Sequence, residues 1–203
     1  MNATASDEPN GHAELWLIRH GETPWSLSRQ HTGRTDVPLT ERGREQARML
    51  APILAQEHFD RVLTSPMSRA IETCRLAGLG DHAEEEPELR EWDYGIYEGR
   101  TTDEIRESAP GWSVWDSPMP EGESIGEIEA RARNLVQRLA ALPGRTALFS
   151  HAHFLRVFAG CWIGDSAALG AHLLLDTATV SILGFERENR AIRQWNVRHP
   201  DVA

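Results

Sequence analysis

Two short apolar runs of the sequence each end in a histidine. Residues 15–18 are followed by Arg19-His20-Gly21, and residues 146–149 by Ser150-His151-Ala152-His153. An imidazole can act as a nucleophile or a general acid–base, and a guanidinium can hold an anion. Open α/β sheets carry their chemistry at the carboxyl ends of such buried strands. The two histidines are therefore candidates for one site, although a solvated Arg and His at a strand end would look the same.

Apolar periodicity and turn residues predict alternating strands and helices along the chain. The expected strands are residues 15–18, 61–64, 83–86, 146–149, 180–185 and 192–197, the last two as a hairpin. The expected helices are residues 41–56, 65–77, 102–108, 124–142 and 154–163. This alternation predicts an α/β fold, a three-layer sandwich with a mostly parallel central sheet flanked by helices.

The length of 203 residues fits a single domain with a sizeable core. We expect a flexible tail over residues 1–13 and one domain over 14–203. Residues 88–123 are rich in Gly, Pro and aromatic residues and do not follow a simple helix or strand pattern. They predict a lid-like excursion from the frame of the domain.

The formal net charge of −10 argues against nucleic acid or an anionic membrane as a partner, because both require a basic surface. All 21 basic residues are arginines. The absence of lysine excludes mechanisms that use a Schiff-base lysine or a phosphate-binding P-loop lysine. A small anionic substrate would need a local cluster of arginines.

Neither a secretory signal nor an apolar run of about 18–20 residues is visible, so we expect a cytoplasmic protein that does not enter the membrane. A homodimer is possible. Cys74 and Cys161 fall in expected helices among apolar neighbours, and we expect both to be reduced core residues.

Five segments together resemble the histidine phosphatase superfamily, in its phosphoglycerate mutase-like branch. They are LIRHGET at 17–23, TGRTDVPLTERG at 32–43, TSPMSRAIET at 64–73, LREWDYGIYEG at 89–99 and SHAHFLR at 150–156. They occur in the order of the family and cover most of the chain from residue 14 to residue 156. The resemblance implies a phosphoglycerate mutase-like fold.

The resemblance also implies roles for individual residues. His20 would be the nucleophile that forms a phosphohistidine, and Glu91 would protonate the leaving oxygen. Arg19, Arg69 and His151 would clamp the phosphoryl oxygens. Phosphoryl transfer needs such a nucleophile, cations and an acid. The other positions expected to contact phosphate or substrate are Ser26, Thr32, Gly33, Tyr94 and Ala152.

Several of these residues have a structural alternative. Arg69 could be a solvated helix residue, and Asp93 or Glu98 could be the acid instead of Glu91. His153 could serve only the start of the following helix. The aromatic residues of the 89–99 segment could be core or lid packing as readily as a substrate platform; they are Trp92, Tyr94 and Tyr97.

The spacing of His151 and His153 also allows a zinc site. The sequence lacks a nearby third ligand motif, and an arginine-rich pocket opposes a cation. We therefore expect no metal and no cofactor.

Mutases of the family have Asn where this chain has Ser26, and a glycine is usual where it has Ala152. The cations with which mutases hold their substrate would fall near Thr102, Asp116 and Ser117, where none is present. These departures favour a metal-independent phosphomonoesterase of the histidine acid phosphatase type. A cofactor-dependent phosphoglycerate mutase is the alternative, and a non-catalytic module that binds phosphorylated ligands is a third.

Within the family, the sequence most resembles the sugar-bisphosphatase-like phosphatases. The segments that carry this likeness are residues 89–99, GWSVW with EGES, residues 151–164 and LLLDTATVSILGF. The resemblance implies a small phosphorylated metabolite as the partner, a sugar phosphate or bisphosphate. The candidates for contact with its distal part are Arg90, Trp115, Arg156 and Asp176.

Overall fold

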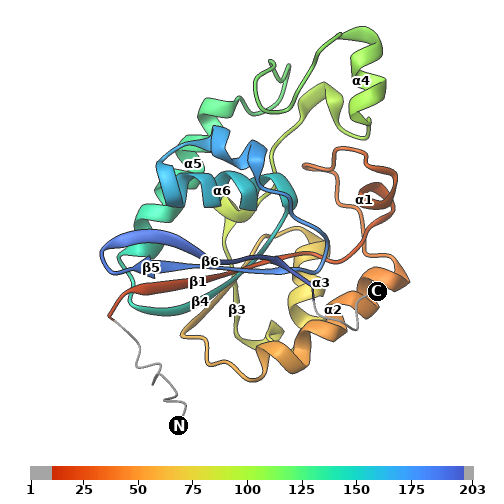
Figure 1. The fold of residues 1–203 in the computed structure, drawn as a ribbon. Coiled ribbons are helices and arrows are strands. Elements are labelled where there is room, and N and C mark those ends of the chain that lie inside the picture. The colour runs from red at the N-terminus through yellow and green to blue at the C-terminus, as the bar shows by residue number, and fades with distance from the viewer. Residues whose placement is uncertain (1–10, 199–203) are drawn as a thin grey trace.

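The computed structural model describes residues 11–198, which form one six-stranded sheet covered by helices (Figure 1). The predicted tail at 1–13 lies outside the described residues except for its last three, and the first strand already begins at Ala13. The strands are β1 (Ala13–Arg19), β2 (Arg61–Thr64), β3 (Ala83–Glu85), β4 (Gly144–Ser150), β5 (Val180–Glu186) and β6 (Asn189–Val197).

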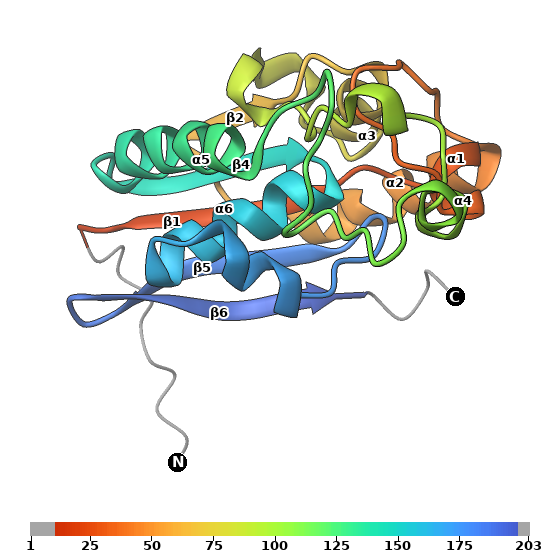
Figure 2. The ribbon, with the colours of Figure 1, turned by 90° about the horizontal axis from the view of Figure 1, so that it is seen from above.

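The sheet has the order β3-β2-β4-β1-β5-β6, and β3, β2, β4 and β1 pair in parallel. Only β5 runs against the other strands of this sheet, and β6 returns beside it as the predicted hairpin. Arg19 pairs with Ser150, so β1 and β4 end at the same level (Figure 2). The mostly parallel sheet is confirmed.

Helices cover both faces of the sheet (Figure 1). The helices α5 (Ile125–Ala140) and α6 (Ala152–Gly164) lie on one face, and α2 (Glu41–Leu54) and α3 (Ser68–Leu76) lie on the other. Alternate side chains of β1 enter two separate cores because successive side chains of a strand point to opposite faces. Leu15 and Leu17 belong to the α5–α6 core, and Trp16 and Ile18 to the α2–α3 core. The structure is thus the expected three-layer sandwich.

A short helix, α1 (Pro24–Ser28), lies where the sequence predicts a loop. Thr23 caps it, since its hydroxyl accepts from the Ser26 amide at 3.0 Å and its own amide donates to Ser26 Oγ at 2.9 Å. A five-residue helix is too short to produce a helical period in the sequence. The helix α2 is continuous through Pro52 and ends at Leu54, two residues before its expected end.

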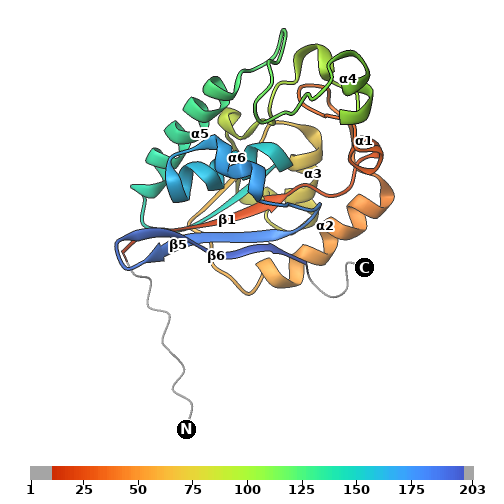
Figure 3. The same cartoon turned by 45° about the horizontal axis from the view of Figure 1, so that its top comes forward.

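The excursion at 88–123 contains the 3₁₀ turns η2 (Pro87–Leu89, which begins one residue earlier) and η3 (Gly95–Tyr97), and α4 (Thr102–Ser108). The predicted bounds of α4 are confirmed. α4 lies beyond the carboxyl ends of β1 and β4, on the same side as α1 (Figure 3). Gly95 has a φ of +52°, and a Cβ there would overlap the backbone of Pro120, so the excursion is tightly folded on itself. Its motion as a lid stays a prediction.

Cys74 and Cys161 are buried in α3 and α6, as predicted, and both are free thiols. Burial raises the pKa of each thiol to about 12. Between residues 11 and 198, no helix is long and apolar enough to cross a membrane. The cytoplasmic location and the homodimer stay predictions.

The loop after β1 meets the first turn of α2 at two glycines. A Cβ on Gly21 would overlap the carbonyl of Gly43, and a Cβ on Gly43 would overlap the carbonyl of Glu22. The Thr40 amide also donates to Glu22 O at 2.9 Å. The backbone that follows His20 is therefore held in place by direct contact with α2.

We predict that Gly43→Ala lowers the free energy of unfolding by about 1–3 kcal/mol, because overpacking forces backbone shifts of this cost. Urea unfolding followed by circular dichroism measures the change. Gly126→Ala is the matched control, since a Cβ on this helical glycine meets nothing within 4 Å. That control should be neutral or stabilising by up to about 1 kcal/mol. An equal destabilisation in both variants would contradict the contact.

Candidate active site

The ends of β1 and β4 bring the two predicted histidines together. Their ring centroids are 5.2 Å apart, and the amide of His20 donates to Ser150 O at 3.0 Å. His20 is 5% exposed and His151 is completely buried. Two strand ends that are remote in sequence therefore form one site.

His20 is held as a neutral imidazole. Its Nδ1 lies 2.7 Å from Gly21 O, so this nitrogen carries the proton and donates it, which leaves the lone pair on Nε2. Burial, followed by the charges of Arg69 and Arg19, lowers the pKa of His20 well below its usual value. A neutral ring with a free Nε2 is the form that can attack phosphorus.

Arg69 is not a solvated helix residue, because its side chain is completely buried. Its Nε donates to His151 Nδ1 at 3.2 Å. Its two Nη groups donate to backbone carbonyls of the loop at 32–35, which are those of Thr32 (3.3 Å), Gly33 (3.0 Å) and Thr35 (3.1 Å). Arg69 thus joins the loop at 32–35 to the second histidine.

His151 is neutral as well. Burial, and then the charge of Arg69, lowers its pKa well below the usual value. Its Nδ1 accepts from Arg69, so its Nε2 carries the proton and donates to Ser65 Oγ at 2.8 Å. Both ring nitrogens are engaged, one of them by a cation, while His153 Nδ1 lies 2.7 Å from the Tyr94 hydroxyl. This pair is poorly suited to bind zinc, and no group of three or more metal-binding side chains occurs within residues 11–198.

Glu91 is a buried carboxyl group at the first turn of α6. Oε1 accepts from the amides of Trp92 (2.9 Å) and Phe154 (2.7 Å), and Oε2 accepts from the amide of His153 (3.0 Å). Burial raises the pKa of Glu91, and these hydrogen bonds and Arg69 only partly oppose it. A raised pKa suits a carboxyl group that must deliver a proton.

The other two candidate acids have different environments. Asp93 pairs with Arg34 at 2.6 Å, and Glu98 accepts from the amides of Gly33 (2.8 Å) and Thr35 (2.6 Å). Of the three, only Glu91 lines the same cavity as His20. The sequence-based choice of Glu91 agrees with this geometry.

Arg19 contributes an unsatisfied donor. Its Nη1 donates to Leu175 O at 2.6 Å, but its Nε is buried without a partner among the described residues. A buried donor of this kind is costly unless a ligand accepts from it. Burial lowers the pKa of Arg19, although the nearby carboxylates of Glu91 and Asp176 oppose the shift, and a guanidinium stays charged in either case.

Arg19, His20 and Glu91 line a cavity of about 460 Å³. Arg69 and His151, which were expected to clamp the phosphoryl oxygens, do not line it. Four arginines line it against a single carboxylate, that of Glu91, so the cavity is positive in a protein of net charge −10. It is lined by Arg19, His20, Ser26, Arg29, Gln30, His31, Thr32, Glu91, Tyr94, Thr102, Arg106, Ser113, Val114, Trp115, Ala152, His153, Arg156 and Leu175.

Most of the predicted binding residues lie on this cavity, but not all. Gly33 and Arg90 line a neighbouring cavity of about 430 Å³, although Gly33 reaches the site through its carbonyl on Arg69. Asp176 lies outside the lining and pairs with Arg198 at 3.0 Å. Ser26 lines the cavity, but its hydroxyl is engaged by Thr23 in the cap of α1.

The positions near Thr102, Asp116 and Ser117 carry no cation, but two arginines at other positions line the cavity. Thr102 lines the cavity as expected for its position, but Arg106, one turn later on α4, lines it too, and Arg29 enters from the end of α1. Neither arginine has a carboxylate within ion-pair distance in the described part of the chain. The alignment of single positions missed them because only the fold of the excursion brings α4 to the cavity.

Aromatic residues form the remaining wall. The ring of His31 lies 4.8 Å from that of Tyr94 and 5.3 Å from that of Trp112. Arg156 lies over the Trp115 ring at 4.5 Å. Trp92 and Tyr97 belong to the α5–α6 core and do not line the cavity.

Comparison with known proteins agrees with this arrangement. The model of the histidine phosphatase superfamily (branch 1) matches residues 15–198. The chain is a member of this superfamily. The family match spans nearly all of the described residues, as the order of the five motifs predicts.

Relatives within the superfamily carry different names. The chain is 42% identical to an acid phosphatase of Mycobacterium tuberculosis, over 88% of this chain and 89% of the relative. It is 30% identical to a probable phosphoglycerate mutase of Cronobacter sakazakii (91% and 90% covered) and 33% identical to the sedoheptulose 1,7-bisphosphatase of Saccharomyces cerevisiae (73% and 66% covered).

A solved structure has the same fold. The product of an open reading frame of Mycobacterium tuberculosis superposes with a TM-score of 0.84 at 38% identity, over 91% of this chain and 97% of that one. The phosphoglycerate mutase-like fold of the histidine phosphatases is therefore confirmed.

The buried neutral histidines make stability depend on pH. Burial lowers the pKa of His31 to about 4, whereas an unfolded histidine titrates near 6.5. The unfolded chain therefore binds a proton that the folded chain refuses, and the free energy of unfolding falls as pH drops below about 6.5. Glu91 opposes this trend, because its raised pKa lets the folded state take up a proton first.

We predict that His31→Gln removes part of this dependence. Between pH 7 and pH 5.5, the wild type should lose about 1 kcal/mol more unfolding free energy than the variant, given the two pKa values. Urea titrations at both pH values measure the difference. Equal losses in the two proteins would mean that His31 is not held neutral by the fold.

Proposed function

We propose that the protein is a metal-independent phosphomonoesterase that hydrolyses small phosphorylated metabolites through a phosphohistidine on His20. The observation that carries the proposal is one positive cavity that holds a buried histidine and a buried carboxyl group with opposite pKa shifts: the pKa of His20 is lowered and that of Glu91 is raised. Together they supply a nucleophile and an acid at the same pH.

In the first half of the reaction, Nε2 of His20 forms a bond to phosphorus while the ester P–O bond breaks. Glu91 gives its proton to the departing oxygen, and the alcohol leaves. Arg19 offers its unpartnered Nε to a phosphoryl oxygen. Arg69 and His151 do not line the cavity; they adjoin His20 and hold the site around it.

In the second half, water attacks the phosphohistidine. The Glu91 carboxylate takes a proton from the water, the new O–P bond forms, and the N–P bond breaks with its electron pair returning to His20. Inorganic phosphate leaves, and both groups are back in their starting protonation states. No step requires a metal ion.

Identity favours hydrolysis over a mutase reaction, since the acid phosphatase shares 42% with the chain and the probable mutase 30%. The cavity itself keeps the second candidate open, because Arg29, Arg106 and Arg156 could hold the second anionic group of a phosphorylated acid. The same cations suit a sugar bisphosphate, which the likeness to a sedoheptulose 1,7-bisphosphatase supports as a substrate class.

The decisive variant is His20→Ala. We expect p-nitrophenyl phosphate hydrolysis in EDTA to fall by more than about a thousandfold, because removal of the nucleophile abolishes the covalent route. Wild type should carry acid-labile phosphate during turnover, and the variant should carry none. His172→Ala, an exposed histidine away from the cavity, is the control. Full activity of His20→Ala in EDTA would rule out the mechanism, and the absence of any turnover or phosphoenzyme in wild type would leave a binding module.

Incubation with 3-phosphoglycerate and bisphosphoglycerate distinguishes the second candidate. A hydrolase should release inorganic phosphate, whereas a mutase should form 2-phosphoglycerate without it. A panel of sugar phosphates and bisphosphates, assayed for phosphate release, then identifies the substrate class.

The distal arginines should discriminate among substrates. For Arg106→Met, we predict a KM about two- to fivefold higher for a bisphosphate, since an exposed ion pair contributes up to about 1 kcal/mol. The KM for p-nitrophenyl phosphate, which has no second anion, should not change. Arg75→Met, outside the cavity lining, serves as the control. An equal rise in KM for both substrates would mean that Arg106 does not bind the second anionic group.

A further inference from the structure

Glu91 is held by backbone on two sides. The segment that leads into it, residues 88–91, begins within the turn η2 and continues past its end. The amides that bind its carboxylate belong to the first turn of α6 and to Trp92. The position of the carboxyl group therefore depends on how this segment is fixed against α6. None of the five segments that resemble the superfamily contains a side chain that obviously fixes residues 88–91 against α6.

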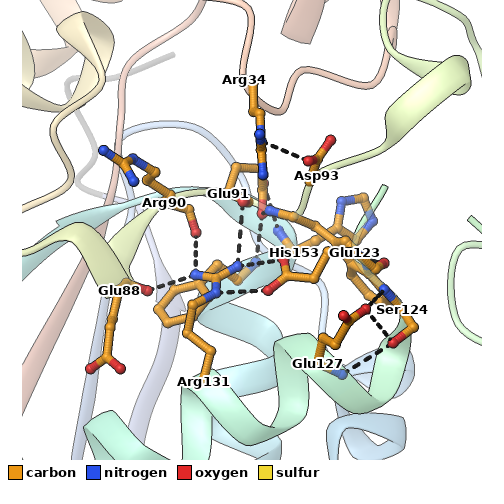
Figure 4. A network of polar contacts seen from close by, with 12 residues as sticks. Arg34, Glu88, Arg90, Glu91, Asp93, Glu123, Ser124, Glu127, Arg131 and His153 are labelled. Atoms are coloured by element: carbon orange, nitrogen blue, oxygen red, sulfur yellow. Dashed lines mark hydrogen bonds and ion pairs between the residues drawn. The ribbon is translucent and has the colours of Figure 1, made fainter. Parts of the chain in front are cut away.

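Arg131 of α5 is that side chain (Figure 4). Its Nη1 donates to the carbonyls of Glu88 at 2.6 Å and Arg90 at 2.8 Å, and its Nη2 donates to the carbonyl of Glu91 at 3.4 Å. Its Nε and Nη2 also bind the two carboxylate oxygens of Glu123 at 2.9 and 2.7 Å. All three guanidinium nitrogens are thus in use.

The same guanidinium lies over the ring of Phe154, 4.6 Å from its centroid. Phe154 is the residue whose amide donates to Glu91 Oε1. Arg131 consequently touches both the chain that carries Glu91 and the helical turn that binds its carboxylate. It lines the neighbouring cavity, not the one that contains His20.

We propose that Arg131 is a positioning residue for the Glu91 acid, acting through its fixed array of donors and not through its charge. This inference rests on the proposed function. The charge of Arg131 is already matched by Glu123, which is 17% exposed against 19% for Arg131. A lysine would keep the charge but could not make this planar set of contacts.

The test compares two leaving groups. An alkyl phosphate such as β-glycerophosphate needs a proton on its leaving oxygen, whereas p-nitrophenolate leaves readily without one. For Arg131→Lys we expect kcat/KM for β-glycerophosphate to fall by about ten- to hundredfold, part of the effect of a general acid. The kcat/KM for p-nitrophenyl phosphate and the inhibition constant of inorganic phosphate should stay within about twofold, because kcat/KM reports the transfer to His20 and not the later attack of water, in which Glu91 serves both substrates as the base.

Arg131→Met should show the same pattern as Arg131→Lys. If the methionine variant does not fold, as judged by its thermal melt, the lysine variant alone carries the comparison. In Arg131→Lys combined with Glu91→Gln, the loss on β-glycerophosphate should be no larger than in Glu91→Gln, because both changes remove the same proton transfer.

Arg138→Met is the matched control. Arg138 lies on the same helix and binds the carboxylates of Glu86 at 2.7 Å and Glu88 at 2.5 Å, but not the carbonyls of residues 88–91. We expect wild-type kinetics on both substrates.

The proposal is wrong if Arg131→Lys behaves as wild type, or if it lowers kcat/KM for both substrates equally. It is also wrong if the losses of Arg131→Lys and Glu91→Gln add. A failure of the proposed function would be seen separately, in wild type and His20→Ala, as hydrolysis that does not depend on His20.

Discussion

The structure depends on a completely buried cation, the guanidinium of Arg69. A buried charge is tolerated only when other groups replace its hydration. Here the replacements are the carbonyls of residues 32–35 and the Nδ1 of His151. Because Arg69 lies on α3 and its partners lie in the loop at 32–35 and at the end of β4, the charge fixes these three segments in one arrangement.

The same burial sets the protonation state of the site. Desolvation disfavours the charged form of every group, so it lowers the pKa of a histidine and raises that of a carboxyl. His20 and Glu91 are shifted in opposite directions by this one cause, and the nearby guanidinium charges add to the shift of His20. For Glu91 the amides of α6 and Arg69 act against burial, and burial prevails. The opposite pKa shifts of the candidate nucleophile and the candidate acid are therefore a property of the fold around them.

The sequence predicts the frame of this site well and its outer wall poorly. The strands that end at Arg19 and Ser150 are apolar runs with polar ends, and the motif residues follow them directly, so the fold and the reactive centre could be read from the chain. Arg29 and Arg106 could not, since they are ordinary exposed helix-end and helix residues until the excursion folds over the cavity. The α1 helix was missed for a related reason: its cap, not a periodic pattern, defines it.

Arg131 shows another limit of the sequence. In the sequence it looks like one of the three arginines of the amphipathic helix α5, which are Arg131, Arg133 and Arg138. It differs from the other two because it binds the backbone carbonyls of the segment at 88–91, and every residue type carries such a carbonyl alike. A residue that recognises main chain leaves no pairing signal, such as an opposite charge at a helical spacing, and only the fold of its partner reveals it.

The charge distribution suits small substrates. A net charge of −10 gives the outer surface a negative potential that repels polyanions, while the arginines of the cavity attract an anion that fits inside it. The cavity of about 460 Å³ is bordered by aromatic rings and α4. If a nucleic acid or a phosphoprotein placed one phosphate there, the rest of its negative charge would lie against the negative surface of the protein. A small phosphate ester that enters the cavity has no such remaining charge outside it. A negative net charge outside and four arginines inside would therefore favour a small anion over a polyanion.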